Sequence, residues 1–190
     1  NPEVIEAKRR GIAVVRRAEM LAELMRMKYG IAVAGTHGKT TTTSLVGAIM
    51  TEAGLDPTVI VGGRLRVSGT GARLGNSDYM VVEADEFDRS FLSLSPILAV
   101  ITSIELDHVD IYKDIGEIET RFAEFAALMP VSGLLVVEGS CPRVAKAARA
   151  ARWRVETYGT GSDDDWRAVR VQDGLEHNTF VVLAPDGRAV

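Results

Sequence analysis

The sequence predicts an α/β fold: a mostly parallel sheet flanked by helices, with a small antiparallel sheet near the C-terminus. Short apolar runs alternate with helix-like patterns through most of the 190 residues. Such alternation favours parallel pairing, because each helix carries the chain back across the sheet. After Gly161 the pattern changes to short β-branched runs separated by Asp-Gly turns, which is typical of antiparallel hairpins.

Glycines mark most of the element ends in the first half of the chain, since glycine readily closes a helix. In chain order, the expected elements are a helix over 2–10, a strand over 12–15, a helix over 18–29, a strand over 31–34, a helix over 40–53, and strands over 58–61 and 79–82. The glycines between positions 62 and 75 indicate irregular loops before the last of these strands.

The second half begins with a buried strand and an amphipathic helix. Apolar residues recur at helical spacing over 115–129, which predicts one buried helix face rather than a cofactor site. The expected elements are a strand over 97–101, that helix, a strand over 134–137, a helix over 142–151, a strand over 154–158, and short antiparallel strands over 167–172, 178–184 and 188–190.

A phosphate-binding loop is expected between the strand at 31–34 and the helix at 40–53. Backbone N–H groups and the positive end of the helix dipole would face an anion there. Lys39 is placed to reach the terminal phosphates, and the Thr40 hydroxyl to hold Mg²⁺. The nucleotide-binding candidates are Gly35, Thr36, His37, Gly38, Lys39, Thr40 and Thr41. The common loop has a glycine where this chain has Val33, so the loop is a variant of that pattern.

Acidic residues follow the strand at 79–82. Glu83, directly at the strand end, is the best Mg²⁺ candidate, since that ion prefers oxygen ligands and shares them with phosphates. Asp85 or Glu86 would hold a substrate amine or orient a metal-bound water. The alternative is an exposed acidic loop, which the phosphate loop nearby makes less attractive.

His108 lies between Asp107 and Asp110, a few residues beyond the strand at 97–101. Ligands of open α/β sheets bind outside the carboxyl ends of the strands, so this segment could reach the same crevice. A lone histidine is more often structural, and its acidic neighbours and position favour a site role here.

Three segments together resemble the Mur ligase family, the amide-forming synthetases of peptidoglycan precursors. They are Gly-Thr-His-Gly-Lys-Thr-Thr-Thr-Thr at 35–43, Glu-Ala-Asp-Glu-Phe-Asp at 83–88 and Asp-His-Val-Asp at 107–110. The resemblance implies that His108 helps to bind a second Mg²⁺, and that Lys39, Glu83 and His108 are the catalytic residues. It also implies that His37 faces the carboxylate substrate or the phosphates, although a loop residue that tolerates the turn is the alternative.

The implied reaction uses ATP and Mg²⁺ to join UDP-N-acetylmuramate to L-alanine through an acyl phosphate. The helix expected over 115–129 contains no lysine, which fits the alanine-adding branch of the family. Two alternatives stay open: a relative that adds a tripeptide, and a nucleotide-binding module without ligase chemistry. By the same resemblance, residues 1–28 are the tail of the N-terminal UDP-substrate domain with its linker, residues 29–190 are the central ATP-binding domain, and the C-terminal domain is absent.

The composition agrees with a cytoplasmic domain that acts on small molecules. Net charge is −4, and lysines and arginines are scattered, so no nucleic-acid surface is expected. Cys141 is the single cysteine, which fits a reducing compartment, and no apolar run is long enough to span a membrane. Asn1-Pro2-Glu3 reads as a helix start, so the chain is expected to be a fragment.

Overall fold

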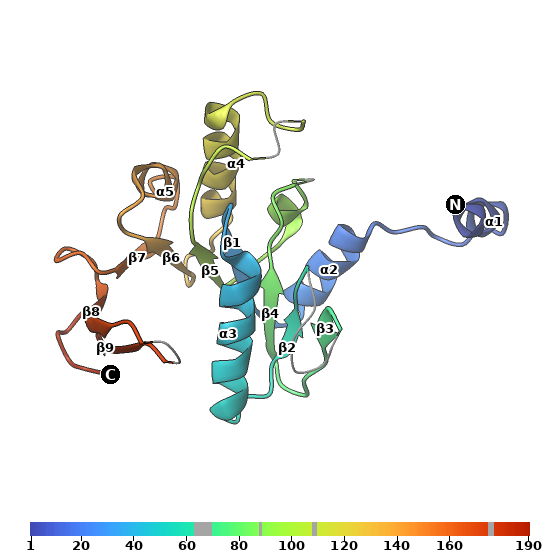
Figure 1. Cartoon of the computed structure of the whole chain (residues 1–190). Coiled ribbons are helices and arrows are strands. Elements are labelled where there is room, and N and C mark those ends of the chain that lie inside the picture. The colour runs from blue at the N-terminus through green and yellow to red at the C-terminus, as the bar shows by residue number, and fades with distance from the viewer. Residues whose placement is uncertain (63–69, 88, 108–109, 175–176) are drawn as a thin grey trace.

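The described residues form one mixed sheet in the order β3-β2-β4-β1-β5-β6-β7-β8-β9 (Figure 1). This computed structural model describes the whole chain except residues 63–69, 88, 108–109 and 175–176. The strands are β1 (Tyr29–Ala34), β2 (Thr58–Ile60), β3 (Ala72–Arg73), β4 (Tyr79–Glu83), β5 (Leu98–Ile101), β6 (Leu134–Glu138), β7 (Arg154–Gly159), β8 (Trp166–Gln172) and β9 (Thr179–Leu183). The helices are α1 (Pro2–Arg9), α2 (Arg17–Arg26), α3 (Lys39–Glu52), α4 (Ile115–Ala127) and α5 (Pro142–Ala148), with a 3₁₀ turn at Ser90–Ser93.

Pairing within the sheet is mostly parallel. β1 pairs in parallel with β4 on one side and β5 on the other, and β2 pairs in parallel with β4. The parallel order continues from β5 through β6 and β7 to β8, whereas β2–β3 and β8–β9 are antiparallel. The predicted α/β class with a mostly parallel sheet is therefore confirmed.

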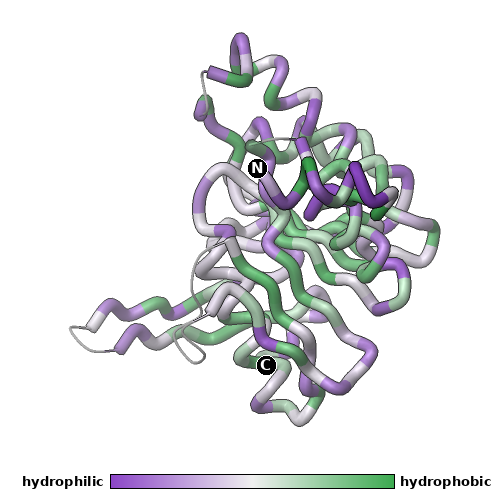
Figure 2. The backbone as a smooth tube through the Cα atoms, turned by 90° about the vertical axis from the view of Figure 1, so that its right-hand side faces the viewer, coloured by the Kyte–Doolittle hydropathy of each residue, from purple (hydrophilic) through white to green (hydrophobic). Residues whose placement is uncertain are grey.

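Helices cover both faces of the sheet. Alternate residues of a strand face opposite sides, so β4 sends Met80 and Val82 into one core and Val81 into the other. The larger core packs the sheet against α2, α4 and α5, and the smaller one packs it against α3. Figure 2 shows the apolar central strands enclosed by more polar helices and loops.

The apolar stripe of α4 lies in the larger core, as its sequence predicts. Asp114 caps the helix, since its side chain accepts a hydrogen bond from the Glu117 backbone N–H at 2.9 Å. Phe122 and Phe125 are fully buried and contact Phe91, with ring centroids 5.4 Å and 5.1 Å away. This packing fixes the chain just after β4, where part of the candidate site lies.

The N-terminal segment differs from the prediction. Residues 12–15 were expected to form a strand, but they are extended and unpaired, and the side chains of Ile12, Val14 and Val15 are exposed. β-branched residues favour an extended backbone, yet a strand also needs a pairing edge, which this segment does not reach. Helix α1 buries no residue and projects from the rest of the molecule (Figure 1).

The C-terminal strands continue the main sheet. β8 joins β7 through only two pairs, Tyr158 with Trp166 and Gly159 with Arg167. The Trp166 indole N–H strengthens this junction by donating to Glu156 at 2.7 Å. Beyond β9, the strand expected over 188–190 is reduced to one isolated bridge between Leu183 and Ala189. Within the described ranges, no helix has the length and hydrophobicity that a membrane crossing requires.

Candidate functional site

The loop at 35–38 lies where the order of the sheet reverses. β1 is followed along the chain by strands on one side and then by β5 on the other, and open α/β sheets bind ligands beyond the carboxyl end of a strand in this position. The loop leaves β1 at Ala34 and enters α3 at Lys39. The sequence-predicted arrangement of strand, loop and helix is confirmed at this position.

Two glycines give the loop its shape. Gly35 has φ +138°, and a Cβ there would lie 2.0 Å from the Thr102 hydroxyl, so no side chain fits. Gly38 has φ +82° and precedes α3 without a side-chain cap. The first N–H groups of α3 thus have no capping side chain and can bind an anion.

Residues after β5 hold the loop in place. The backbone N–H of Thr36 donates to the Ser103 carbonyl at 2.9 Å, and that of His37 donates to the Ser103 hydroxyl at 3.0 Å. The Thr102 hydroxyl donates to the His37 carbonyl at 2.6 Å, and the Glu105 N–H donates to the Thr36 hydroxyl at 2.9 Å. The sequence analysis missed Thr102 and Ser103, although two hydroxyl residues at the end of a central parallel strand were a usable signal.

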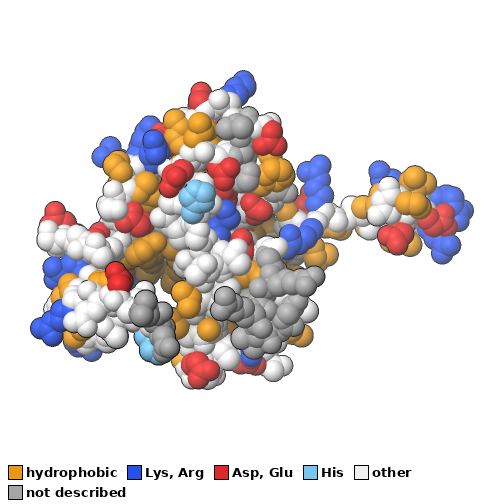
Figure 3. Space-filling view, viewed as in Figure 1, with side chains coloured by type: hydrophobic (Ala, Val, Ile, Leu, Met, Phe, Trp, Pro, Cys, Tyr) orange, Lys and Arg blue, Asp and Glu red, His pale blue; other side chains and the backbone are white. Residues whose placement is uncertain are grey.

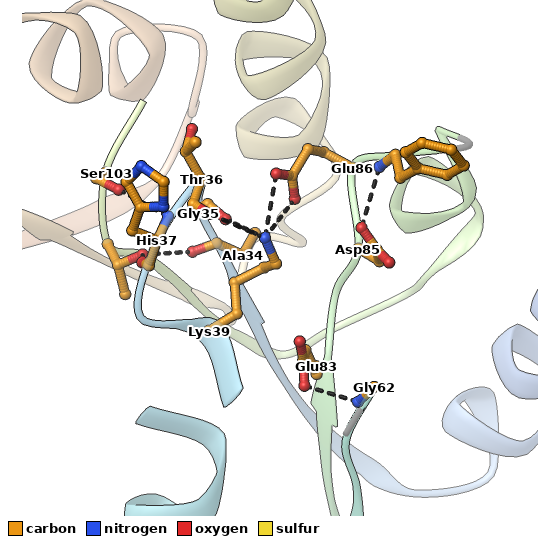
Figure 4. Close-up of polar contacts among 12 residues, drawn as sticks. Ala34, Gly35, Thr36, His37, Lys39, Gly62, Glu83, Asp85, Glu86 and Ser103 are labelled. Atoms are coloured by element: carbon orange, nitrogen blue, oxygen red, sulfur yellow. Dashed lines mark hydrogen bonds and ion pairs between the residues drawn. The ribbon is translucent and has the colours of Figure 1, made fainter. Parts of the chain in front are cut away.

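Lys39 turns back over the loop (Figure 4). Its Nζ donates to the carbonyls of Gly35 at 2.7 Å and Thr36 at 3.2 Å, and to Glu86 Oε1 at 3.1 Å. The second Glu86 oxygen lies 3.0 Å from the same nitrogen, and the two side chains are 13% and 3% exposed. Burial raises the pKa of the Glu86 carboxyl, while the Lys39 ammonium acts in the opposite direction.

Thr40 and Glu83 meet beside the loop. The Thr40 hydroxyl donates to Glu83 Oε1 at 2.9 Å, and the Gly62 N–H holds the other carboxylate oxygen at 2.7 Å. Neighbouring ligands of an octahedral Mg²⁺ with bonds of about 2.0–2.1 Å are about 2.9 Å apart. The spacing and the hard oxygen donors therefore fit two ligands of a magnesium ion.

The remaining acids after β4 do not join this pair. Asp85 is exposed and accepts from the Phe87 N–H at 3.1 Å, while Glu86 turns to Lys39. Asp88 lies outside the described residues. Among the residues that the structure describes, no three or more His, Cys, Asp or Glu side chains are grouped to hold a metal. The acidic run is thus divided between separate tasks rather than forming one cluster.

His37 projects from the mouth of the loop. Its side chain is 65% exposed, and Nε2 lies 3.7 Å from an oxygen of Glu105, whose side chain is also exposed. On the face shown in Figure 3, a histidine, acidic groups and basic groups lie close together. His37 is accessible to a ligand, and its direct role stays a prediction.

The predicted role of His108 falls on a residue outside the described part of the chain. Of its acidic neighbours, Asp107 is half-buried and Asp110 is exposed. The assignment of His108 as a catalytic and metal-binding residue therefore stays a prediction from the sequence.

A cavity of about 100 Å³ lies beside Glu83. Its walls come from α2, the end of β4 and the 3₁₀ turn, with Arg17, Gly62, Asp85 and Ser90 among the lining residues. The lining thus combines one basic residue, Arg17, with two acidic residues, Glu83 and Asp85.

Comparison with known proteins identifies the family. The family model described as "Mur ligase middle domain" matches residues 33–190, and that described as "Mur ligase family, catalytic domain" matches residues 1–29. The UDP-N-acetylmuramate--L-alanine ligase of Geotalea uraniireducens (strain Rf4) is 54% identical over 181 residues, which cover 95% of this chain and 40% of that protein. The chain thus spans about two-fifths of the length of this curated relative.

Solved structures agree with this relationship. The UDP-N-acetylmuramate:L-alanyl-gamma-D-glutamyl-meso-diaminopimelate ligase from Neisseria meningitides has a TM-score of 0.82 and 29% identity, and the match covers 98% of this chain and 61% of that one. The UDP-N-acetylmuramate-alanine ligase from Thermotoga maritima has a TM-score of 0.78 and 22% identity, covering 100% and 43%, and supports the fold alone. Because the middle-domain model covers most of its length, the chain belongs to the Mur ligase family.

Proposed function

We propose that the chain is the nucleotide-binding part of an ATP-dependent ligase that joins L-alanine to UDP-N-acetylmuramate in peptidoglycan precursor synthesis. The observation that carries the proposal is the phosphate loop itself, with Lys39 held at its carbonyls and Thr40 bonded to Glu83 beside it. The alanine ligase that is 54% identical to this chain supports the choice of substrates.

The proposed roles follow from the geometry. The N–H groups at the start of α3 and the Lys39 ammonium would bind the phosphates of ATP. Thr40 and Glu83 would hold Mg²⁺, which supplies positive charge against the phosphate oxygens when bound. His37 and the N–H groups of Gly38 and Thr41 lie around the same end of α3 and complete the proposed nucleotide site.

The proposed reaction has two steps. The γ-phosphoryl group of ATP moves to the lactyl carboxylate of UDP-N-acetylmuramate, which forms an acyl phosphate and releases ADP. The L-alanine amine then attacks the acyl carbon, and phosphate leaves as the amide bond forms. Phosphoryl transfer depends mainly on positioning and charge neutralisation, the two tasks that a fixed loop and Lys39 can perform.

The proposed domain organisation follows the family. Residues 1–28 would be the end of the UDP-substrate domain with its linker, and residues 29–190 the ATP-binding domain. The exposed apolar side chains of Ile5, Ile12 and Val14 agree with contacts to further parts of the ligase. The single free cysteine, Cys141, agrees with the proposed cytoplasmic location.

Two other functions can be weighed against this one. The structural neighbour from Neisseria meningitides is a ligase for a tripeptide substrate by its title, but it is only 29% identical to this chain. A regulatory module that binds nucleotide without chemistry could use Lys39, Thr40 and Glu83 in the same way. The 54% identity to an alanine ligase, rather than the site geometry, favours the alanine-adding ligase over both alternatives.

The test uses the parent protein, meaning the polypeptide in which this sequence occurs. It would be incubated with MgATP and UDP-N-acetylmuramate together with either L-alanine or the tripeptide. ADP release and UDP-N-acetylmuramyl-alanine formation, both dependent on L-alanine, are expected. Turnover only with the tripeptide would support the second function, and nucleotide binding without product would support the regulatory module.

The 190-residue chain alone should bind MgATP weakly, with a Kd on the order of 1 mM, which corresponds to a binding free energy of about −4 kcal/mol. Its phosphate loop is complete, but the sequence up to Val190 indicates no adenine pocket, so the phosphates are expected to contribute more to binding than the base. Titration calorimetry with MgATP, MgGTP and magnesium triphosphate should give similar affinities. Tight binding of ATP with rejection of GTP would contradict this prediction, as would the absence of any binding at millimolar ATP.

His108→Ala in the parent protein should leave MgATP affinity nearly unchanged and slow acyl phosphate formation about 100-fold. The sequence places His108 beyond a different strand from Glu83, and the loss of one preorganised electrostatic group has an effect of about this size. Single-turnover ADP release, measured beside MgATP binding, separates the two effects. Normal turnover by the variant would favour a purely structural histidine.

A further inference from the structure

The ammonium of Lys39 has no spare hydrogen-bond donor. A lysine has three N–H groups, and here they face the carbonyls of Gly35 and Thr36 and the carboxylate of Glu86. An incoming phosphate must therefore replace one of these partners. We propose that Glu86 is the positioning residue of Lys39: it holds the ammonium at the phosphate loop while no nucleotide is bound and yields it to the phosphate.

The backbone of Glu86 is firmly held. Its carbonyl accepts hydrogen bonds from the hydroxyl of Tyr112, which is 1% exposed, and from the Arg89 N–H at 3.1 Å. The Glu86 residue itself is 2% exposed. The carboxylate thus comes from a fixed, buried position, whereas the neighbouring Asp85 is exposed and caps a local turn.

A need for stability alone does not explain this pair. Burial of a carboxylate and an ammonium costs desolvation energy, and such pairs often stabilise a fold less than apolar residues would. Lysine also has a long, flexible stem that loses conformational freedom when it is held. A fixed carboxylate, however, keeps the charge of Lys39 at the loop and prevents the side chain from swinging into solvent.

The same carboxylate must compete with an anionic ligand. Both Glu86 oxygens lie within 3.1 Å of the Lys39 nitrogen, so a phosphate that takes this ammonium has to displace a like charge. This competition between Glu86 and the phosphate rests on the proposed nucleotide function. Removal of the charge on Glu86 should therefore strengthen phosphate binding, which the loss of a merely structural residue would not do.

The binding test compares inorganic triphosphate affinity in the parent protein and in Glu86→Gln. Glutamine keeps the shape and an acceptor oxygen but removes the charge. Calorimetry should show about tenfold tighter triphosphate binding, which corresponds to the contribution of one charge-assisted hydrogen bond to affinity. Glu138→Gln is the matched control, because it removes a charge at the same edge of the sheet from a carboxylate that accepts from the Ser140 N–H, and its affinity should stay within about twofold.

A double-mutant cycle shows whether the effect passes through Lys39. In a Lys39→Met background, the gain from Glu86→Gln should shrink to the part that comes from direct repulsion between the carboxylate and the phosphates, because no ammonium remains for them to compete over. An equal gain in both backgrounds would overturn the inference in favour of a general charge effect. Weaker or unchanged binding by Glu86→Gln in the unmodified background would overturn it as well.

NMR of the ¹⁵N-labelled lysine ammonium tests, without any ligand, whether Glu86 holds Lys39. The Lys39 ammonium should exchange slowly with water in the nucleotide-free parent protein and fast in Glu86→Gln. Fast exchange in the parent protein would overturn the positioning role. If Glu86→Gln does not fold, Glu86→Asp can replace it, because it keeps the charge but shortens the side chain by one methylene. The Lys39 ammonium should then exchange faster and triphosphate should bind more tightly than in the parent protein, each by less than is expected for Glu86→Gln.

Failure of the proposed function is distinguishable from failure of this inference. If the parent protein binds no triphosphate, the nucleotide function and the competition with phosphate are both wrong. The NMR measurement still decides whether Glu86 holds Lys39. If triphosphate binds but Glu86→Gln has no effect, the nucleotide function stands and the inference is wrong.

Discussion

Glu83→Ala in the parent protein should lower the kcat/KM for MgATP about a thousandfold. The carboxylate lies 2.9 Å from the Thr40 hydroxyl and is oriented by the Gly62 N–H, so alanine removes one of the two proposed magnesium ligands. The loss of a preorganised electrostatic group at phosphoryl transfer has an effect of about 10²–10³-fold, and weaker metal binding adds to it. Steady-state kinetics and MgATP titration should both reveal the defect.

Glu138→Ala is the matched control for this variant. Glu138 ends β6 at the same edge of the sheet, as Glu83 ends β4, but its carboxylate accepts from the Ser140 N–H at 3.0 Å instead of from Thr40. Its kcat/KM should stay within about twofold of the parent value. If Glu83→Ala binds MgATP as the parent protein does, the Glu83 carboxylate is not a metal ligand.

Gly35→Ala should abolish measurable MgATP binding and lower the free energy of unfolding by about 2–3 kcal/mol. The new Cβ would lie 2.0 Å from the Thr102 hydroxyl and 3.0 Å from the Ser103 N–H, and the backbone φ of +138° is strained for any side chain. Relief of this clash requires the loop to separate from the segment that anchors it. Denaturant unfolding and calorimetry measure the two effects.

Gly54→Ala separates backbone strain from damage to the loop. Gly54 follows α3 with φ +76°, and a Cβ there would meet nothing within 4 Å. Its substitution should cost about 1 kcal/mol of stability and leave MgATP affinity unchanged. Nucleotide binding by Gly35→Ala at the parent affinity would show that the close contact with Thr102 is not needed for the loop.

The parts of the fold that depend on local pattern were predictable. The apolar stripe of α4 and the alternation of strands with helices give a period and an order that follow from the sequence. The strand expected over 12–15 failed because β-branched residues indicate an extended backbone but not a partner. The attachment of β8 to β7 depends on two residue pairs and one indole hydrogen bond, which no local pattern contains.

The candidate site likewise has parts that the sequence predicts and parts that it does not. The loop from Gly35 to Lys39 and the position of Glu83 follow from strand ends that were recognisable in the sequence. The partner of Lys39 was not predictable, because Glu86 is 47 residues away and its neighbours Glu83 and Asp85 carry the same charge. Similarly, the bond from Thr102 to His37 joins residues 65 apart, and only the docking of β5 on β1 brings them together.

The central position of β1 also has a thermodynamic consequence. The loop extends from β1, Glu83 ends β4 and Thr102 follows β5, so a bound nucleotide would contact or depend on three adjacent strands at once. Ligand binding would then stabilise these strands against opening, as one cooperative unit, by mass action on their shared folded state. Amides of the β8–β9 hairpin, joined to β7 by two pairs, would gain little protection from hydrogen exchange.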